Sequence, residues 1–158
     1  MSRKQIDFME LAFEEAFAGM RNNEGGPFGA IVVLDGKIIG RGHNQVLLAQ
    51  DPTAHAEIIA IREACQHIQN IHLENAILYS TCEPCPMCLA AIQWAQIPRV
   101  EYVMNRADAQ KIGFSDLRIY QKMGIPDGVY AAELLLVPHE QGKNLFEEWE
   151  RKSDKVFY

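Results

Sequence analysis

The chain has 158 residues, of which 48% are hydrophobic, and this predicts one globular domain over residues 1–158 with a core large enough to fold unaided. Fifteen Lys and Arg residues against 21 Asp and Glu residues give a net charge of −6, which argues against nucleic acid as a partner. The first residues lack the apolar core of a signal peptide and no run has the length of a membrane span, so a membrane protein is not expected.

Hydrophobic periodicity and turn signals predict the first elements. Apolar residues at helical spacing indicate a helix over residues 7–20, which ends before the loop NNEGGP. Two β-rich runs, 28–34 and 37–46, are separated by Asp35-Gly36, the strongest short hairpin signal. These two strands are therefore expected to pair antiparallel.

Helices and strands alternate in the rest of the chain. The expected elements are a helix over 55–66, a short buried strand over 76–80, a helix over 86–95, a strand over 99–104, a last strand over 129–137 and an amphipathic helix over 144–152. This order favours an α/β fold in which helices cover both faces of a partly parallel sheet.

Two short motifs place metal-binding residue types at helix starts: His55 with Glu57 in TAHAE, and Cys85 with Cys88 in PCPMC. Residues three apart on a helix share a face, so the two sulfurs can converge on one ion, and the helix N-terminus lowers thiol pKa. Two thiolates and one imidazole suit zinc, and three protein ligands leave the fourth tetrahedral position to water. The sequence therefore predicts one catalytic Zn²⁺ per chain, held by His55, Cys85 and Cys88.

Cys82 leaves alternatives open, because it has the same three-residue spacing from Cys85 as Cys88 has. It could serve as a ligand, or form a thioredoxin-like redox pair with Cys85. Cys88 is preferred as the ligand because Cys82 precedes Pro84 and lies outside the helix. Three cysteines within seven residues differ from the dispersed framework of a secreted disulfide protein and predict a reducing, cytoplasmic setting.

Glu57 is the candidate for proton transfer. An amine on an aromatic ring leaves poorly, so its hydrolysis needs a nucleophile at the ring carbon and protons at the ring nitrogen and the amine. Zinc lowers the pKa of a bound water to about 7, and a carboxylate that is not a ligand can take that proton and hand it on. The plainer interpretation of Glu57 is an acidic residue that the helix dipole favours.

At these residues the chain resembles the cytidine deaminase-like superfamily of zinc deaminases, whose H-x-E and P-C-x-x-C signature appears as HAE (55–57) and PCPMC (84–88). A narrower similarity, to the bacterial guanine deaminase branch, lies in GGPFGA (25–30), DPTAHAE (51–57), TCEPCPMCLAAI (81–92) and GFSD (113–116). The resemblance implies a three-layer α/β/α sandwich with a mixed five-stranded sheet, a homodimer, and conversion of guanine to xanthine and ammonia in purine metabolism.

The resemblance also implies roles around the base. Asn44 would hydrogen-bond the base, and Asp116 would relay protons to the leaving amine. Phe28 and Trp94 would line the pocket or stack on the base, and Ala56 of the HAE motif is counted with the substrate-binding positions. Plainer interpretations stay open: core packing for the two aromatic residues, a turn role for Asn44 and a helix N-cap for Asp116.

The carboxyl-terminal helix and tail, about 140–158, resemble a segment that closes over the pocket of the same or a partner subunit. Phe157 or Tyr158 would cap the bound base and exclude water. The alternative is a frayed terminus without a role.

Other functions fit the same motifs and stay open as alternatives. A tRNA adenosine deaminase shares DPTAHAE and the E-P-C-x-M-C core, but such an enzyme should show a basic surface, which the acidic charge balance argues against. Guanosine and cytosine are alternative substrates. A non-catalytic zinc module that binds a protein partner is the alternative from a different class.

Overall fold

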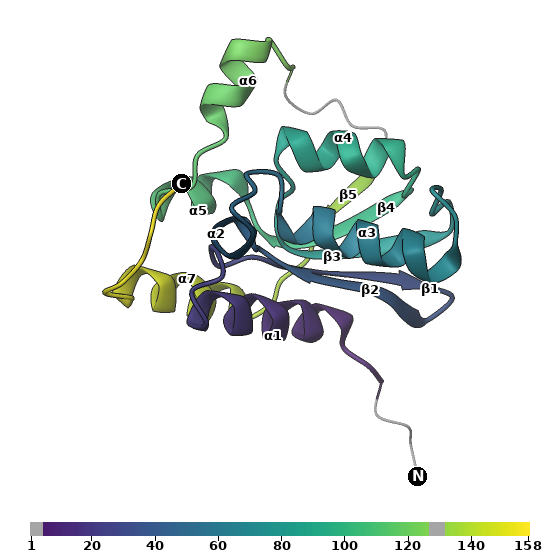
Figure 1. Cartoon of the computed structure of the whole chain (residues 1–158), viewed down its shortest axis with the longest axis horizontal. Helices are drawn as coiled ribbons and strands as arrows, with labels where there is room; N and C mark the ends of the chain where they lie inside the picture. Colours follow the sequence, from purple (N-terminus) through teal and green to yellow (C-terminus); the bar gives the residue numbers. More distant parts are fainter. Residues whose placement is uncertain (1–4, 127–131) are drawn as a thin grey trace.

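The computed structural model describes residues 5–126 and 132–158, and a five-stranded sheet runs through its middle (Figure 1). The strands are β1 (Gly29–Leu34), β2 (Lys37–His43), β3 (Ala76–Cys82), β4 (Arg99–Met104) and β5 (Glu133–Leu136). They lie in the order β2-β1-β3-β4-β5; β1 pairs antiparallel with β2 and β3, whereas β3, β4 and β5 are parallel. The predicted mixed, partly parallel sheet is confirmed.

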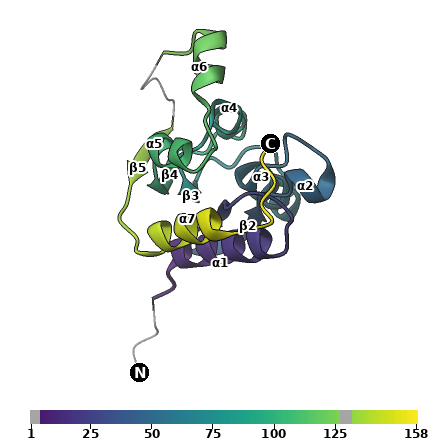
Figure 2. The same cartoon turned by 90° about the vertical axis from the view of Figure 1, so that its left-hand side faces the viewer.

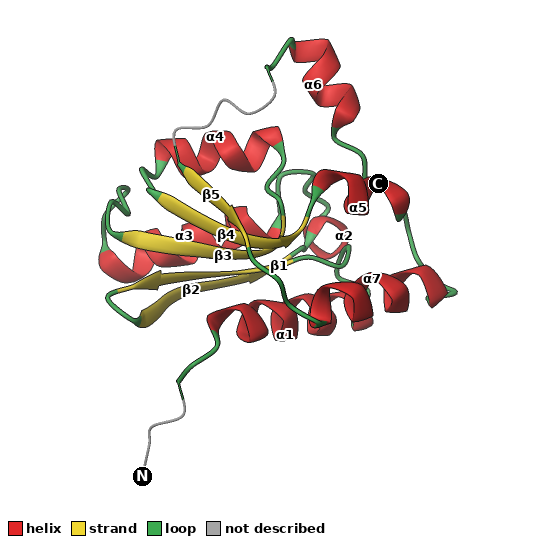
Figure 3. Ribbon diagram, turned by 180° about the vertical axis from the view of Figure 1, so that it is seen from behind, coloured by secondary structure: helices red, strands yellow, loops and turns green. Residues whose placement is uncertain are grey.

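Helices cover both faces of this sheet. Figures 2 and 3 show α1 (Phe8–Arg21) beside α7 (Gln141–Arg151) on one face, while α3 (Ala56–Ile68) and α4 (Pro86–Trp94) cover the other. The short helices are α2 (Val46–Ala49), α5 (Arg106–Lys111) and α6 (Leu117–Met123). This arrangement confirms the three-layer α/β/α sandwich. In the described part of the chain, no helix combines the length and apolar character needed to cross a bilayer.

The predicted hairpin is also confirmed. Asp35 and Gly36 both have positive φ angles, 50° and 72°, as the two central residues of a type I′ turn require. Leu34 and Lys37 are the first pair of the antiparallel register that follows from this turn. The hairpin brings the start of β1 and the end of β2 to the same edge of the sheet.

Several predicted boundaries are wrong where side chains bond to nearby backbone. The strand expected over 37–46 ends at His43, because the Asn44 side chain accepts a hydrogen bond from the Val46 N–H at 3.1 Å and the chain turns into α2. Helix α5 was not predicted; a capping box between Asn105 and Asp108 begins it.

Two further boundaries concern the carboxyl-terminal third. The last strand, expected over 129–137, is observed as the four-residue β5, and 129–131 lie outside the described residues. The terminal helix, expected over 144–152, begins one turn earlier, at Gln141. Its Trp149 is 1% exposed and donates a hydrogen bond from Nε1 to the Ile112 carbonyl at 3.3 Å, which fixes α7 against the end of α5.

Close backbone packing positions α3 on the sheet. A Cβ atom at Gly40 of β2 would collide with the Ala60 carbonyl oxygen, and one at Gly42 with the Ala56 carbonyl oxygen. Only residues without a side chain let the helix approach this closely. The first turn of α3 is thereby held next to the sheet edge where β2 ends.

His43 links the same edge to α1 and to the loop after it. Its Nδ1 lies 3.0 Å from the Glu15 carboxylate, and its Nε2 hydrogen-bonds the carboxylate of Glu24. The hydrogen bond to Glu15, helped by Glu24 and opposed by burial, raises the pKa of His43 above its ordinary value. The imidazole therefore links two segments of chain to the end of β2.

Replacing His43 with Gln should make the protein less stable in a pH-dependent way. A raised folded-state pKa contributes stability that is fully present below the unfolded pKa of about 6.5 and is lost as pH rises through the folded value. The difference in unfolding free energy between wild type and His43→Gln, about 1–2 kcal/mol at pH 5.5, should thus shrink by pH 9. Urea unfolding at both pH values measures it; a difference that stays constant or grows would contradict the assignment.

Candidate active site

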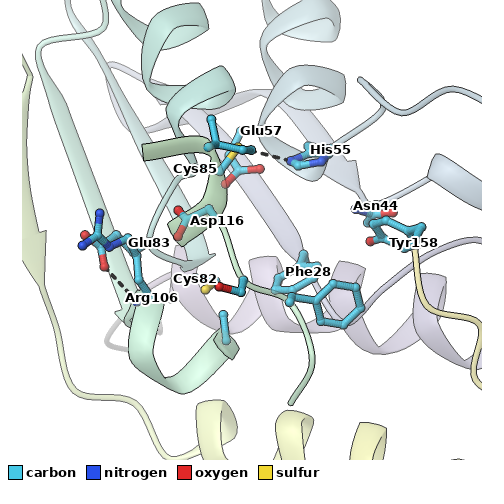
Figure 4. A pocket seen from close by; sticks show the side chains of 14 residues that line it. Phe28, Asn44, His55, Glu57, Cys82, Glu83, Cys85, Arg106, Asp116 and Tyr158 are labelled. Carbon is cyan, nitrogen blue, oxygen red and sulfur yellow. Dashed lines mark hydrogen bonds between the residues drawn. The ribbon is translucent and has the colours of Figure 1, made fainter. Parts of the chain in front are cut away.

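A cavity of about 220 Å³ opens at the sheet edge where β3 ends and β1 begins (Figure 4). It brings together residues from both halves of the chain, which a sheet edge can do because neighbouring strands end there. Of the sequence-predicted residues, the cavity is lined by Phe28, Asn44, His55, Glu57, Cys82, Cys85, Asp116 and Tyr158.

The predicted metal ligands converge on one point of this cavity. His55 is the N-cap residue of α3 and Cys85 that of α4, with Cys88 one turn into α4. The His55 Nδ1 lies 3.6 Å from each of the two sulfurs, and all three ligand atoms are within 4.8 Å of one another. One imidazole and two thiols in this arrangement fit a zinc ion with three protein ligands.

The surroundings of the two thiols shift their pKa values in opposite directions. A hydrogen bond from Cys88, together with the neighbouring His55, lowers the pKa of Cys85 to about 4 in spite of burial. The pKa of Cys88 rises in response, because it shares a proton with the Cys85 thiolate and is buried. Burial disfavours protonation of His55, but its hydrogen bond to Cys85 and the charge of Glu57 raise its pKa overall.

Glu57 follows His55 by two residues and reaches the same group from the first turn of α3. Its carboxylate is 7% exposed, and Oε2 lies 3.5 Å from the Cys88 sulfur. Burial raises the pKa of Glu57, and the charge of His55 opposes this. Ser80 Oγ lies 3.3 Å from Oε1 while its hydroxyl donates to the Cys82 carbonyl at 2.7 Å. Glu57 is thus a buried carboxyl group whose two oxygens contact Ser80 and Cys88.

Asp116 and Asn44 face the cavity from opposite sides (Figure 4). Asp116 is the N-cap residue of α6, but its side chain makes no capping hydrogen bond, so the plainer N-cap interpretation does not account for the carboxylate. Burial raises the pKa of Asp116, opposed by the charge of Arg106. Asn44 is 2% exposed and serves the turn before α2 as well as lining the cavity.

The carboxyl terminus reaches the cavity of its own chain. Tyr158 accepts a hydrogen bond from the Gly26 N–H at 3.2 Å, and its ring packs 5.2 Å from that of Phe114. Burial raises the pKa of the Tyr158 hydroxyl. Phe157 packs on Phe114 and Trp149 and does not line the cavity. Of the two tail residues considered, the geometry brings Tyr158 to the cavity.

Two predicted positions lie outside the lining of this cavity. Trp94 ends α4 with 83% of its surface exposed and lies outside this cavity. Ala56 is fully buried in the hydrophobic cluster between α3 and the sheet, so its side chain cannot touch a ligand. Phe28 fills both roles that were considered: it lines the cavity and packs against Phe114 with ring centres 5.0 Å apart.

Cys82 lines the floor of the cavity but does not join the metal-binding group found among the described residues. It ends β3, is 6% exposed, and burial raises its thiol pKa well above the ordinary value. Because the Cys88 sulfur lies 3.6 Å from the His55 Nδ1 and belongs to that group, the geometry favours Cys88 over Cys82 as the ligand. All four cysteines are free thiols.

Six further cavity residues had no predicted role: Glu83, Arg106, Ala109, Phe114, Ser115 and Ile119. Glu83 and Phe114 lie inside segments that carried the family resemblance, TCEPCPMCLAAI and GFSD, so that resemblance could have indicated them. Arg106 lies in no recognised motif, and only the tertiary structure brings it to the cavity.

Comparison with known proteins agrees with this geometry. Residues 2–104 match the model of the cytidine and deoxycytidylate deaminase zinc-binding region. A guanine deaminase of Bacillus subtilis is 40% identical over 96% of this chain and 97% of its own, and its X-ray structure superposes with a TM-score of 0.73 over 96% of each chain. A tRNA-specific adenosine deaminase of Aquifex aeolicus is 34% identical over 92% of this chain and 93% of its own.

Zinc binding should depend on Cys88 and not on Cys82. Cys88→Ser is expected to lose zinc and, with it, thermal stability, because metal-binding free energy contributes to folding. Cys82→Ser should retain one zinc per chain, and Cys65→Ser, on the outer part of α3, is the matched control. Elemental analysis of the three purified variants measures this. Full zinc in Cys88→Ser together with loss of zinc in Cys82→Ser would reverse the assignment.

Proposed function

The chain belongs to the cytidine and deoxycytidylate deaminase zinc-binding family and is a zinc-dependent deaminase, and we propose that its substrate is guanine, which it hydrolyses to xanthine and ammonia. The observation that carries the proposal is one cavity at the His55, Cys85 and Cys88 group that is also lined by three carboxyl groups and has an aromatic cover. Similarity to a guanine deaminase over nearly the whole chain supports the choice of base. This activity would place the protein in purine metabolism.

His55, Cys85 and Cys88 would hold the zinc ion. When bound, zinc supplies a Lewis acid that lowers the pKa of a water molecule to about 7. Glu57 is not one of the three residues of the metal-binding group, and its raised pKa suits a group that must first accept a proton and then give it up. We assign to Glu57 the transfer of a proton from water to the ring nitrogen.

We assign the remaining roles according to where each side chain lies in the cavity. Asp116 is assigned to proton relay toward the leaving amine, since its carboxylate lies on the wall next to Cys85. Asn44 would hydrogen-bond the base with the part of its amide that the Val46 N–H does not use. Phe28 offers an aromatic wall, and the Tyr158 ring would cover the bound base.

A tRNA substrate is the competing proposal, and two features weigh against it. The net charge is −6, whereas binding a polyanion calls for a concentration of Lys and Arg. The carboxyl-terminal Tyr158 also lies at the cavity, where a flipped nucleotide attached to RNA would have to enter. Both features suit a small free base.

We further propose that the chain forms a homodimer in a reducing, cytoplasmic compartment. Helices α4 and α6, which lie near each other (Figures 1 and 2), expose large apolar side chains: Trp94 (83%), Met123 (70%), Leu117 (44%) and Ile119 (40%). Exposed apolar surface of this kind favours association. Thiol ligands are retained best in a reducing setting. Sedimentation of the intact chain measures the oligomeric state, and a crystal structure of the dimer would show whether tails are exchanged between subunits.

Guanine should release ammonia with the purified zinc-loaded protein, and Glu57→Gln should reduce kcat by at least about 100-fold while zinc content stays at one per chain. Guanosine, cytosine, adenine and a tRNA anticodon stem complete the substrate panel. Glu74→Gln, an exposed substitution of the same chemistry, is the control. Reaction with the RNA alone would overturn the guanine proposal, and an active Glu57→Gln would remove Glu57 from the chemistry.

Deleting residues 155–158 should lower kcat for guanine by about tenfold or more without changing zinc content, because water then enters the reaction cavity. Tyr158→Phe removes only the hydroxyl that accepts from Gly26 and should cost less, about fivefold, as expected for one hydrogen bond of about 1 kcal/mol. Steady-state turnover and elemental analysis measure both variants. Wild-type turnover in the deletion would show that the tail has no part in catalysis.

A further inference from the structure

Arg106 connects the metal-binding loop to the neighbouring strand and helix. It is the first residue of α5, and its backbone N–H donates to the Glu83 carboxylate at 2.9 Å. The Glu83 N–H donates in turn to the Met104 carbonyl at 2.7 Å. Because Glu83 lies two residues before Cys85, these bonds fix the start of α5 to the loop that carries a metal ligand (Figure 4).

The side chain of Arg106 reaches in the other direction, toward α6. Its guanidinium carbon lies 4.1 Å from the centre of the Tyr120 ring. Tyr120 is 5% exposed and is the buried residue of α6, whereas Met123 on the same helix is 70% exposed. A planar guanidinium stacked on an aromatic face is a stabilising contact, stronger where solvent is excluded. Helix α6 thus packs against the rest of the molecule where the Arg106 guanidinium lies over the Tyr120 ring.

Asp116 is joined to the first turn of that helix by backbone hydrogen bonds. Its carbonyl oxygen accepts hydrogen bonds from the Ile119 N–H at 2.9 Å and the Tyr120 N–H at 3.2 Å, so Asp116 and Tyr120 belong to one rigid turn. The Asp116 carboxylate lines the cavity together with Glu83 and Arg106. The positive charge of Arg106 also counteracts the cost of burying that carboxylate.

We propose that Arg106 is a positioning residue. The packing of its guanidinium on the Tyr120 ring holds the Asp116 carboxylate at the cavity. The hydrogen bond from its backbone N–H to Glu83 fixes the position of the Asp116 carboxylate relative to the metal-binding loop. The proposal rests on the proposed function, because Asp116 is assigned there to proton relay. A lysine cannot replace the arginine, since an ammonium group is a point charge without a planar face to stack.

The test compares the zinc-loaded variants Arg106→Gln, Arg106→Lys, Asp116→Asn and the double variant. Arg106→Gln should lower kcat for guanine by about 10- to 100-fold, with a much smaller change in KM and with zinc content unchanged. Arg106→Lys should recover little of the loss. If Arg106 acts through Asp116, the double variant should be no slower than Asp116→Asn alone. Arg118→Gln, an exposed arginine on α6, is the matched control.

Amide hydrogen exchange gives a readout that does not need activity. Exchange of the amides over 117–123 should be faster in Arg106→Gln than in wild type and Arg118→Gln, because α6 loses the packing of the guanidinium on Tyr120. Tyr120→Leu removes the stacked ring and should reproduce both effects, while Tyr120→Phe should keep more activity than Tyr120→Leu. This pair decides the matter if Arg106→Gln folds poorly.

Wild-type kcat in Arg106→Gln, losses that multiply in the double variant, or unchanged exchange over 117–123 would each overturn the proposal. Failure of the wild-type protein to deaminate guanine would instead overturn the proposed function. In that case the exchange comparison still decides whether Arg106 holds α6 in place.

Discussion

The active site depends on two helices that begin side by side at one edge of the sheet, where the His55 Nδ1 lies 3.6 Å from the Cys85 sulfur. His55 ends the loop before α3 and Cys85 ends the loop before α4, so both ligands occupy N-cap positions with extended backbone. The close approach of α3 to the glycines of β2, and the short loop from β3 into α4, bring these two starts together. A shift of either helix along its axis would separate the three ligand atoms.

This convergence gathers negative charge in a buried place. Two thiols and the Glu57 carboxyl lie within hydrogen-bonding range of one another, and burial alone makes their ionised forms costly. The positive ends of two helix dipoles offset part of that cost. A divalent cation offsets much more, so the same arrangement that raises the pKa of Cys88 favours a bound zinc ion. The site is therefore shaped for metal by its electrostatics as well as by its distances.

The cavity is completed by the carboxyl-terminal third of the chain. The family match covers residues 2–104 and includes the metal ligands, Glu57 and Asn44. Asp116, Phe114 and Tyr158, which form the opposite wall and the cover, lie beyond it. The metal ligands and the opposite wall of the cavity thus come from different parts of the sequence. Helix α7 ties the two parts together, because it packs beside α1 and carries the tail to the cavity.

Features that depend on neighbours along the chain could be predicted from the residues alone. The Asp35-Gly36 hairpin, the ligand spacing of Cys85 and Cys88, and the helix starts at His55 and Pro86 follow from local geometry, which a few residues specify. The end of β2 was missed, although the signal was local, because the Asn44 side chain competes with the strand for backbone hydrogen bonds.

Contacts between side chains that lie far apart in the sequence could not be predicted in this way. Helix α4 is apolar on all sides, so its sequence could not show that Trp94 faces away from the cavity. The bond between Arg106 and Glu83 and the contact of Tyr158 with Gly26 join residues 23 and 132 positions apart. Such contacts are set by how helices and strands pack, and packing is a property of the whole chain that no local pattern contains.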